Sequence, residues 1–132
     1  MSKANATGIT ITDSDARGVL TFDLRDVLAV IGESSREALW HVRVVECVGD
    51  GAAVAELDRL SKTGERINDA RLRELAEVVE QVIDGTFHGV LPTGEQISIY
   101  AVDSTAFDVV TDRADVLAAL RSRFRYVADI PN

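Results

Sequence analysis

The first candidates for nucleophilic or general-base chemistry in this chain are its one cysteine and two histidines. Cys47 lies between Glu46 and Val48 within a strand pattern, and is itself in neither a glycine-rich elbow nor the first turn of a helix. A cysteine becomes reactive when a nearby cation or a helix N-terminus lowers its pKa, and the sequence around Cys47 offers neither. We therefore expect Cys47 to be a small buried hydrophobic residue rather than a nucleophile partnered by His41 or His88.

Motifs for metal, phosphate or acyl-transfer chemistry are incomplete. His41 and His88 have no partner at metal-ligand spacing, so we expect no metal site and no cofactor. The Asp-Ser-Asp of residues 13–15 lacks the later ligands of a calcium loop and predicts a turn. The Gly-Asp-Gly of residues 49–51 precedes a helix, as a phosphate loop does, but lacks the other residues of that motif. The Asp-Ser-Thr of residues 103–105 has no histidine nearby to serve as a base, which favours a hairpin turn over a hydrolase site.

Charge narrows the classes of partner. The chain has 132 residues, with 14 basic and 22 acidic side chains and a net charge of -8. Such a surface repels nucleic acids and anionic membranes, so we expect neither as a partner. The charge would favour a basic protein partner, and the alternative is that it only keeps the protein soluble. Three arginines could contact an acidic partner, although cations at a helix C-terminus also complement the helix dipole. They are Arg121, Arg123 and Arg125.

Composition indicates a single globular domain in a reducing compartment. The one cysteine excludes an internal disulfide, and 46% hydrophobic with 27% charged residues is typical of a soluble protein. The first residues lack the apolar run of a signal peptide, and no stretch approaches the about 20 apolar residues of a membrane span. We expect a cytoplasmic protein with a flexible N-terminal segment at residues 1–8 and one domain at residues 9–132.

The first half of the chain alternates between strand and helix patterns. We expect a strand at residues 8–12 and a helix at residues 24–31, with Asp23 as its N-cap and Gly32 as its stop. A long strand is expected at residues 38–48. Its alternation assigns Trp40, Val42, Val44 and Val48 to one face and His41, Arg43, Val45 and Cys47 to the other.

Two helices and a run of short strands follow. The helices are expected at residues 52–60, closed by Gly64, and at residues 68–84, closed by Gly85. The second has an unbroken apolar stripe that includes Val79, Val82 and Ile83. Strands at residues 86–91, 97–102 and 106–110 come next, then a helix capped by Asp112, and then a short strand at residues 126–130.

These elements predict the fold class. Strands joined by turns too short for a crossover must pair antiparallel. Helices then cover one face of the sheet, which makes a two-layer α+β domain with the element order β-α-β-α-α-β-β-β-α-β.

Three segments resemble a family of small uncharacterised bacterial single-domain proteins. The segments are Trp40 with Glu46-Cys47, residues 81–87 (QVIDGTF) and residues 101–107 (AVDSTAF). The resemblance covers roughly residues 20–130, and it implies one domain of that fold. No activity is assigned to that family, so the resemblance implies no catalytic residue.

Three functional hypotheses remain open. We favour a non-enzymatic protein-binding module, immunity-protein-like, inhibitor-like or adaptor-like, that uses its acidic surface. The second hypothesis is an enzyme or small-ligand binder with a pocket between sheet and helices. Its candidate lining residues are Trp40, His41, Glu46, His88, Tyr100 and Asp103. The third is a homo-oligomer assembled through an exposed edge of the sheet.

Overall fold

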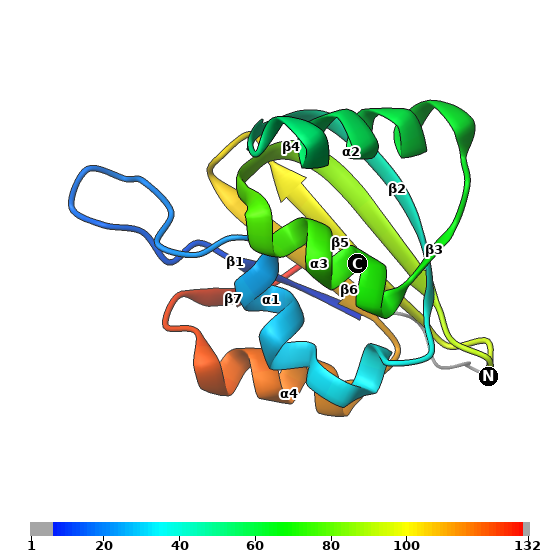
Figure 1. Cartoon of the computed structure of the whole chain (residues 1–132). Coiled ribbons are helices and arrows are strands. Elements are labelled where there is room, and N and C mark those ends of the chain that lie inside the picture. The colour runs from blue at the N-terminus through cyan, green and yellow to red at the C-terminus, as the bar shows by residue number, and fades with distance from the viewer. Residues whose placement is uncertain (1–6, 131–132) are drawn as a thin grey trace.

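A computed structural model describes residues 7–130 as an antiparallel sheet with helices on one face and the helix of residues 51–63 along the edge of the strand of residues 39–49 (Figure 1). The strands are β1 (Thr7–Ile11), β2 (Leu39–Gly49), β3 (Ile67–Asn68), β4 (Val79–Val90), β5 (Gln96–Val102), β6 (Ala106–Thr111) and β7 (Val127–Asp129). The helices are α1 (Leu24–Ile31), α2 (Gly51–Thr63), α3 (Asp69–Val78) and α4 (Ala114–Arg123), with a 3-10 turn η1 (Gly32–Ser35) after α1.

The predicted two-layer α+β class is confirmed. The seven strands have the order β3-β2-β4-β5-β6-β1-β7, and every pair is antiparallel. The element order differs from the expected one by the two-residue strand β3 between α2 and α3. Thr7 and Gly8, which we assigned to the N-terminal segment, belong to β1, and residues 1–6 of that segment lie outside the described residues.

Local capping residues set the helix boundaries. Asp23 caps α1 through a capping box with Asp26, and Gly32 ends the helix. The side chain of Asp50 accepts a hydrogen bond from the backbone N–H of Ala53 at the start of α2, and α2 ends at Gly64 in the left-handed conformation (φ 74°). Asp23, Gly32 and Gly64 were predicted from the sequence because each acts on residues close to it in the chain, whereas the capping role of Asp50 was not predicted.

The prediction of a helix as far as residue 84 is wrong. Helix α3 ends at Val78, and β4 runs from Val79 to Val90. Val79 and Val82 are buried at 2% exposure, as the helical stripe requires, but they face the core from a strand that pairs with the end of β2. Their β-branched side chains suit a strand, and the carboxylate of Asp23 accepts the backbone N–H of Val82.

A β-bulge changes the faces that we expected for the end of β2. Val44 pairs with Gly85, but the register shifts between Val44 and Glu46 and again between Glu46 and Cys47. Cys47 therefore packs against the core, whereas Val48 is 46% exposed.

The expected cap of the last helix is also wrong. Arg113, not Asp112, is the N-cap residue of α4, and its side chain makes no capping hydrogen bond. The backbone N–H of Arg113 instead donates to Oγ1 of Thr111. Asp115 is in the first turn, as expected.

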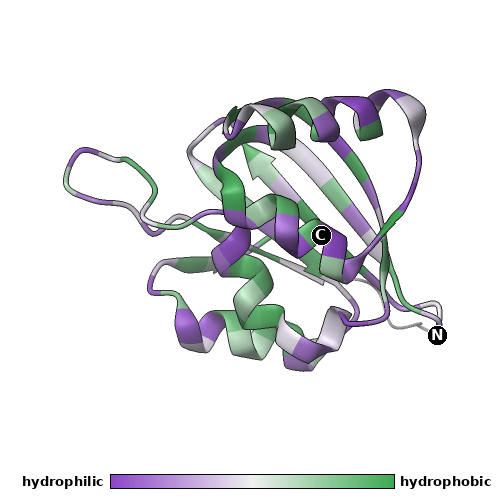
Figure 2. Cartoon of the chain, in the orientation of Figure 1, coloured by the Kyte–Doolittle hydropathy of each residue, from purple (hydrophilic) through white to green (hydrophobic). Residues whose placement is uncertain are grey.

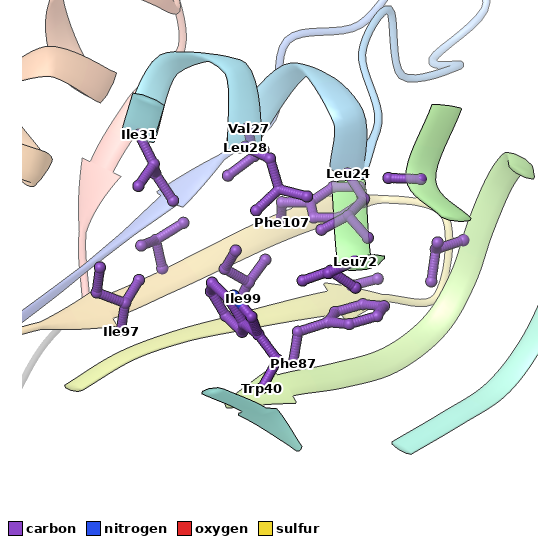
Figure 3. Close-up of a cluster of buried hydrophobic side chains, with 14 of the residues drawn as sticks. Leu24, Val27, Leu28, Ile31, Trp40, Leu72, Phe87, Ile97, Ile99 and Phe107 are labelled. Carbon is purple, nitrogen blue, oxygen red and sulfur yellow. The ribbon is translucent and has the colours of Figure 1, made fainter. Parts of the chain in front are cut away.

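The core lies between the sheet and the helices. Each helix carries both hydrophobic and hydrophilic residues, as expected for a helix with one face on a sheet (Figure 2). The buried side chains of α1 point toward the sheet (Figure 3). There they meet a single cluster that includes Trp40, Phe87, Ile97, Ile99 and Phe107, each at most 1% exposed. Among the residues described, no helix is long and apolar enough to cross a membrane.

Candidate functional site

The six residues expected to line a pocket are spread over three regions. Trp40 is fully buried in the core. The strand register places His41, His88 and Tyr100 on the side of the sheet that the helices leave uncovered, which we call the open face. Glu46 and Asp103 lie near one end of the sheet. Glu46 alone lines one of the five cavities described, a groove of about 400 Å³ between β2 and α2.

The open face contains one short side-chain hydrogen bond. Nδ1 of His88 lies 2.6 Å from Oγ of Ser98 on the neighbouring strand. A serine nucleophile needs a base that is itself oriented by a third group and an exposed position for the substrate. Ser98 is only 6% exposed, and among the described contacts no carboxylate orients His88. This pair fixes the two side chains on the sheet and offers no acyl-transfer site.

Cys47 is not activated. Burial raises the pKa of its thiol, and the nearby carboxylates of Asp23 and Asp58 raise it further. A raised pKa keeps the sulfur in its poorly nucleophilic thiol form at neutral pH.

Two motifs considered for catalysis or phosphate binding have structural roles. Asp103 and Ser104 have positive φ angles of 49° and 62°, and the backbone N–H of Thr105 donates to the carbonyl of Val102 to close the turn between β5 and β6. At the start of α2, the carboxylate of Asp50 occupies the place where a phosphate would bind.

The side chains of Arg121 and Arg123 near the C-terminus also make contacts within the protein. Arg121 forms an ion pair with Asp129 on β7, and the guanidinium of Arg123 lies 5.2 Å from the ring centroid of Phe124. The backbone N–H of Arg125 donates to the carboxylate of Asp13.

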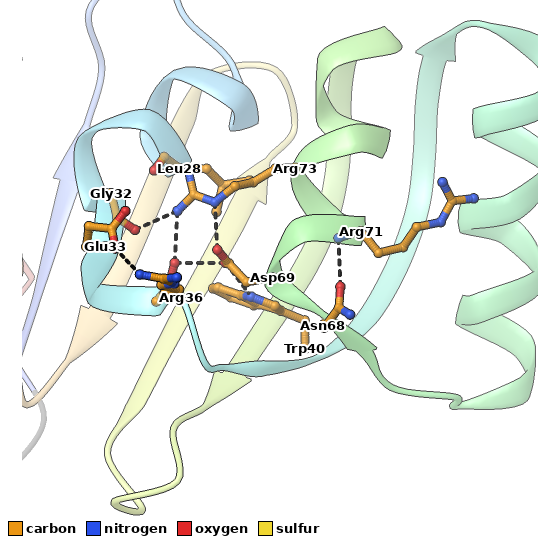
Figure 4. A network of polar contacts seen from close by, with 10 residues as sticks. Leu28, Gly32, Glu33, Arg36, Trp40, Asn68, Asp69, Arg71 and Arg73 are labelled. Carbon is orange, nitrogen blue, oxygen red and sulfur yellow. Dashed lines mark hydrogen bonds and ion pairs between the residues drawn. The ribbon is translucent and has the colours of Figure 1, made fainter.

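The most connected polar cluster joins α3 to α1 and β2 (Figure 4). Asp69, 4% exposed, accepts hydrogen bonds from Ser35 Oγ (2.8 Å), Trp40 Nε1 (3.0 Å) and Arg73 Nε (2.7 Å). Arg73 also donates to the backbone carbonyls of Leu28 and Gly32 at the end of α1. Because every donor and acceptor has a partner inside the protein, this cluster stabilises the fold and is not a binding site.

A group of carboxylates gathers at the end of the sheet where β4 begins, and we call it the acidic end. It consists of Asp26, Glu46, Asp50, Glu80, Asp84 and Asp103. Glu46 and Asp84 are opposite one another on β2 and β4. The backbone N–H of Ser104 donates to the carbonyl of Ile83, which brings the turn carrying Asp103 beside Asp84.

The carboxylates of the acidic end form no ion pairs within residues 7–130, although Asp26 and Asp50 accept backbone N–H groups as helix caps. The ten ion pairs found among residues 7–130 use none of its six members. Like charges placed directly opposite on neighbouring strands destabilise a sheet, and Glu46 and Asp84 are both exposed. Within residues 7–130, no three or more side chains of histidine, cysteine, aspartate or glutamate are grouped so that they could hold a metal ion. The carboxylates of the acidic end therefore do not converge on an ion.

A cavity of about 340 Å³ opens at the acidic end. Asp26 and Glu80 line it together with Asp23, Arg25 and the exposed side chain of Val48. Burial raises the pKa of Asp23 to about 6, although backbone N–H donors from Leu24 and Val82 favour its charged form. The guanidinium of Arg25 donates to the carbonyl of Val79.

A hairpin of residues 13–21, which we call the finger, projects beside this cavity (Figure 1, blue). Its tip is held by Asp15, whose carboxylate accepts the backbone N–H groups of Arg17 and Val19. These bonds lower the pKa of Asp15. At the base, Asp13 accepts the backbone N–H groups of residues 125 and 126. The finger is therefore preorganised although it projects into solvent.

Sequence reasoning predicted an acidic protein but missed the acidic end. Glu46 and Asp84 are far apart in the chain, and only the register of β2 against β4 places them together. Comparison of the chain with protein-family models, with curated proteins and with solved structures found no match.

Proposed function

We propose that the protein is a cytoplasmic, non-enzymatic protein-binding module whose acidic end binds a basic protein partner. The observation that carries this proposal is the set of six carboxylates without ion-pair partners at one end of the sheet, of which Asp26 and Glu80 line the cavity. Elsewhere in the described chain, acidic side chains such as Glu33, Glu56 and Asp115 are paired with arginines.

The electrostatics favour a protein cation over a small ligand. Complementary charge raises the rate of association and excludes wrong partners. A lysine or arginine side chain of the partner would enter the cavity between Asp26 and Glu80, while the finger with Val19, 47% exposed, provides a rigid apolar contact at its rim. The repulsion between Glu46 and Asp84 would be relieved on binding, because a cation between them replaces a like-charge contact.

Site-specific photocrosslinking in the native host tests this proposal. A benzoylphenylalanine at Val48, which is exposed and lines the cavity, is expected to form an adduct with one basic protein. The same probe at Thr93, an exposed residue in the turn between β4 and β5, is expected not to form it.

Charge reversal supplies the matched control. Glu80→Lys with Asp84→Lys should abolish the Val48 adduct, whereas Glu33→Lys with Glu37→Lys changes the net charge equally after the end of α1 and should leave it intact. An adduct with an acidic protein, or equal loss in both double variants, would count against the acidic end as the binding surface.

A further inference from the structure

The open face presents two rows of side chains that run across the sheet. The register aligns one row of residues across it, Arg43, Thr86, Tyr100, Asp108 and Thr10. A second row contains His41, His88, Ser98, Val110 and Gly8. The formal charges of these two rows are Arg43 and Asp108, a share of the ten residues close to the 27% of the whole chain. Tyr100, 37% exposed, lies between them near the centre of the face, and aromatic residues are enriched at protein–protein interfaces.

The two charges have opposite signs and occupy opposite ends of one row. Arg43 on β2 is exposed and, within residues 7–130, forms no ion pair. Asp108 on β6 accepts one hydrogen bond at Oδ1, from Oγ1 of Thr10 (2.8 Å), which leaves Oδ2 available. Thr86 and Tyr100 lie between them, and Tyr100 is 37% exposed.

We propose that a second copy of this chain packs on the open face, with a two-fold axis parallel to the strands between β4 and β5. A rotation of 180° about that axis places each row of one copy against the same row of the other copy, in the reverse order. Strand β2 of one copy then faces β6 of the other, and β4 faces β5. Arg43 of each copy then meets Asp108 of the other, and Thr86 meets Tyr100. The row is therefore complementary to itself, as a closed two-fold interface requires.

The area of the open face fits a weak, reversible dimer. Strands are about 4.8 Å apart and rise about 3.4 Å per residue, so each outward-facing residue covers roughly 33 Å². About 15 outward-facing residues on the strands from β2 to β1, the two rows and their neighbours along the strands, then contribute about 500 Å² per copy. This area is near the lower limit for a specific interface. We expect a dissociation constant in the micromolar range. Because the axis follows the strands, both acidic ends lie at the same end of the dimer.

Sedimentation velocity from about 1 to 200 µM at 0.15 M salt, where the Debye length is about 8 Å, tests this inference. The wild-type protein is expected to change from monomer to dimer. Arg43→Asp and Asp108→Arg should each weaken self-association by at least about tenfold. The double variant carrying both changes restores the opposite charges and should recover most of the lost affinity. Arg71→Asp on α3, away from the open face, should have no effect.

Tyr100→Arg provides an independent variant, since it places a cation at the centre of the face and should give a monomer. Far-ultraviolet circular dichroism confirms folding of each variant. A wild-type monomer at 200 µM, as expected if another protein or solvent covers this face, overturns the inference. So does a dimer that survives Tyr100→Arg, or a double variant no better than the single ones. Glu80→Lys with Asp84→Lys should still dimerise, so failure of the proposed function and failure of the dimer give different results.

Discussion

Replacing Asp69 by alanine is expected to be the most destabilising change in the polar cluster of Figure 4. The carboxylate accepts three side-chain hydrogen bonds within a site that is 4% exposed. Alanine removes both carboxylate oxygens, and with them all three hydrogen bonds, and leaves a space that is too enclosed for free hydration of the donors.

The magnitude follows from what each donor loses. The indole N–H of Trp40, at 0% exposure, loses its acceptor, which costs about 1–3 kcal/mol. The Arg73 side chain is 30% exposed and keeps the carbonyls of Leu28 and Gly32, so its loss is about 1 kcal/mol. The loss of the hydrogen bond from the Ser35 hydroxyl costs about 1 kcal/mol more. We expect Asp69→Ala to lower the free energy of unfolding by about 3–5 kcal/mol.

Urea unfolding followed by tryptophan fluorescence measures this loss, since Trp40 is the only tryptophan of the chain and touches the altered site. With a urea slope of about 2 kcal/mol per M, the midpoint should fall by roughly 2 M. Asp69→Asn keeps one acceptor for Trp40 and Ser35 and should lose about half as much. Glu74→Ala removes an exposed pair with Arg71 and should change the free energy by less than about 0.5 kcal/mol. An Asp69→Ala loss below about 1 kcal/mol would refute the assigned role of the cluster.

Three further predictions concern individual groups. Because burial raises the pKa of Asp23 to about 6, the folded protein keeps a proton between about pH 4 and 6 that the unfolded chain releases. The free energy of unfolding should therefore fall by up to about 1.4 kcal/mol per pH unit as the pH rises through that window. In Asp23→Asn, the midpoint of urea unfolding should depend less on pH than in the wild type. An unchanged dependence on pH would contradict the prediction. Ser104→Gly should raise the melting temperature through a gain of roughly 0.5–1 kcal/mol, since φ is 62° at that position, whereas Ser104→Ala, the control, should give no gain. Cys47 should react with a disulfide reagent at pH 7 more slowly in the folded protein than in 8 M urea, because its thiol pKa is raised, and equal rates would exclude this.

Features that depend on neighbouring residues were predictable from the sequence. Asp23 and Gly64 mark helix ends through their own side chains or backbone freedom, and the turn at residues 103–105 follows from residues that tolerate a positive φ. The start of β4 was not predictable, because Val79 and Val82 satisfy a helical stripe and a strand equally well. Only pairing with the end of β2 decides between them.

Of the candidate site, only the negative sign of its charge could be predicted from the sequence. The net charge of -8 is a property of composition, whereas the acidic end is created by strand register and by contact of the turn at Ser104 with Ile83. The candidate lining residues chosen by type alone, such as Trp40 and His41, are separated because alternation in a strand sends neighbours to opposite faces.

The affinity of the crosslinked partner for matched charge-reversal variants tests the central claim most directly. Binding is measured by titration calorimetry at several salt concentrations. Glu80→Lys with Asp84→Lys should weaken binding by at least about tenfold and reduce its dependence on salt, while Glu33→Lys with Glu37→Lys should bind as the wild type does. Equal affinities for the two double variants would show that the acidic end does not bind the partner.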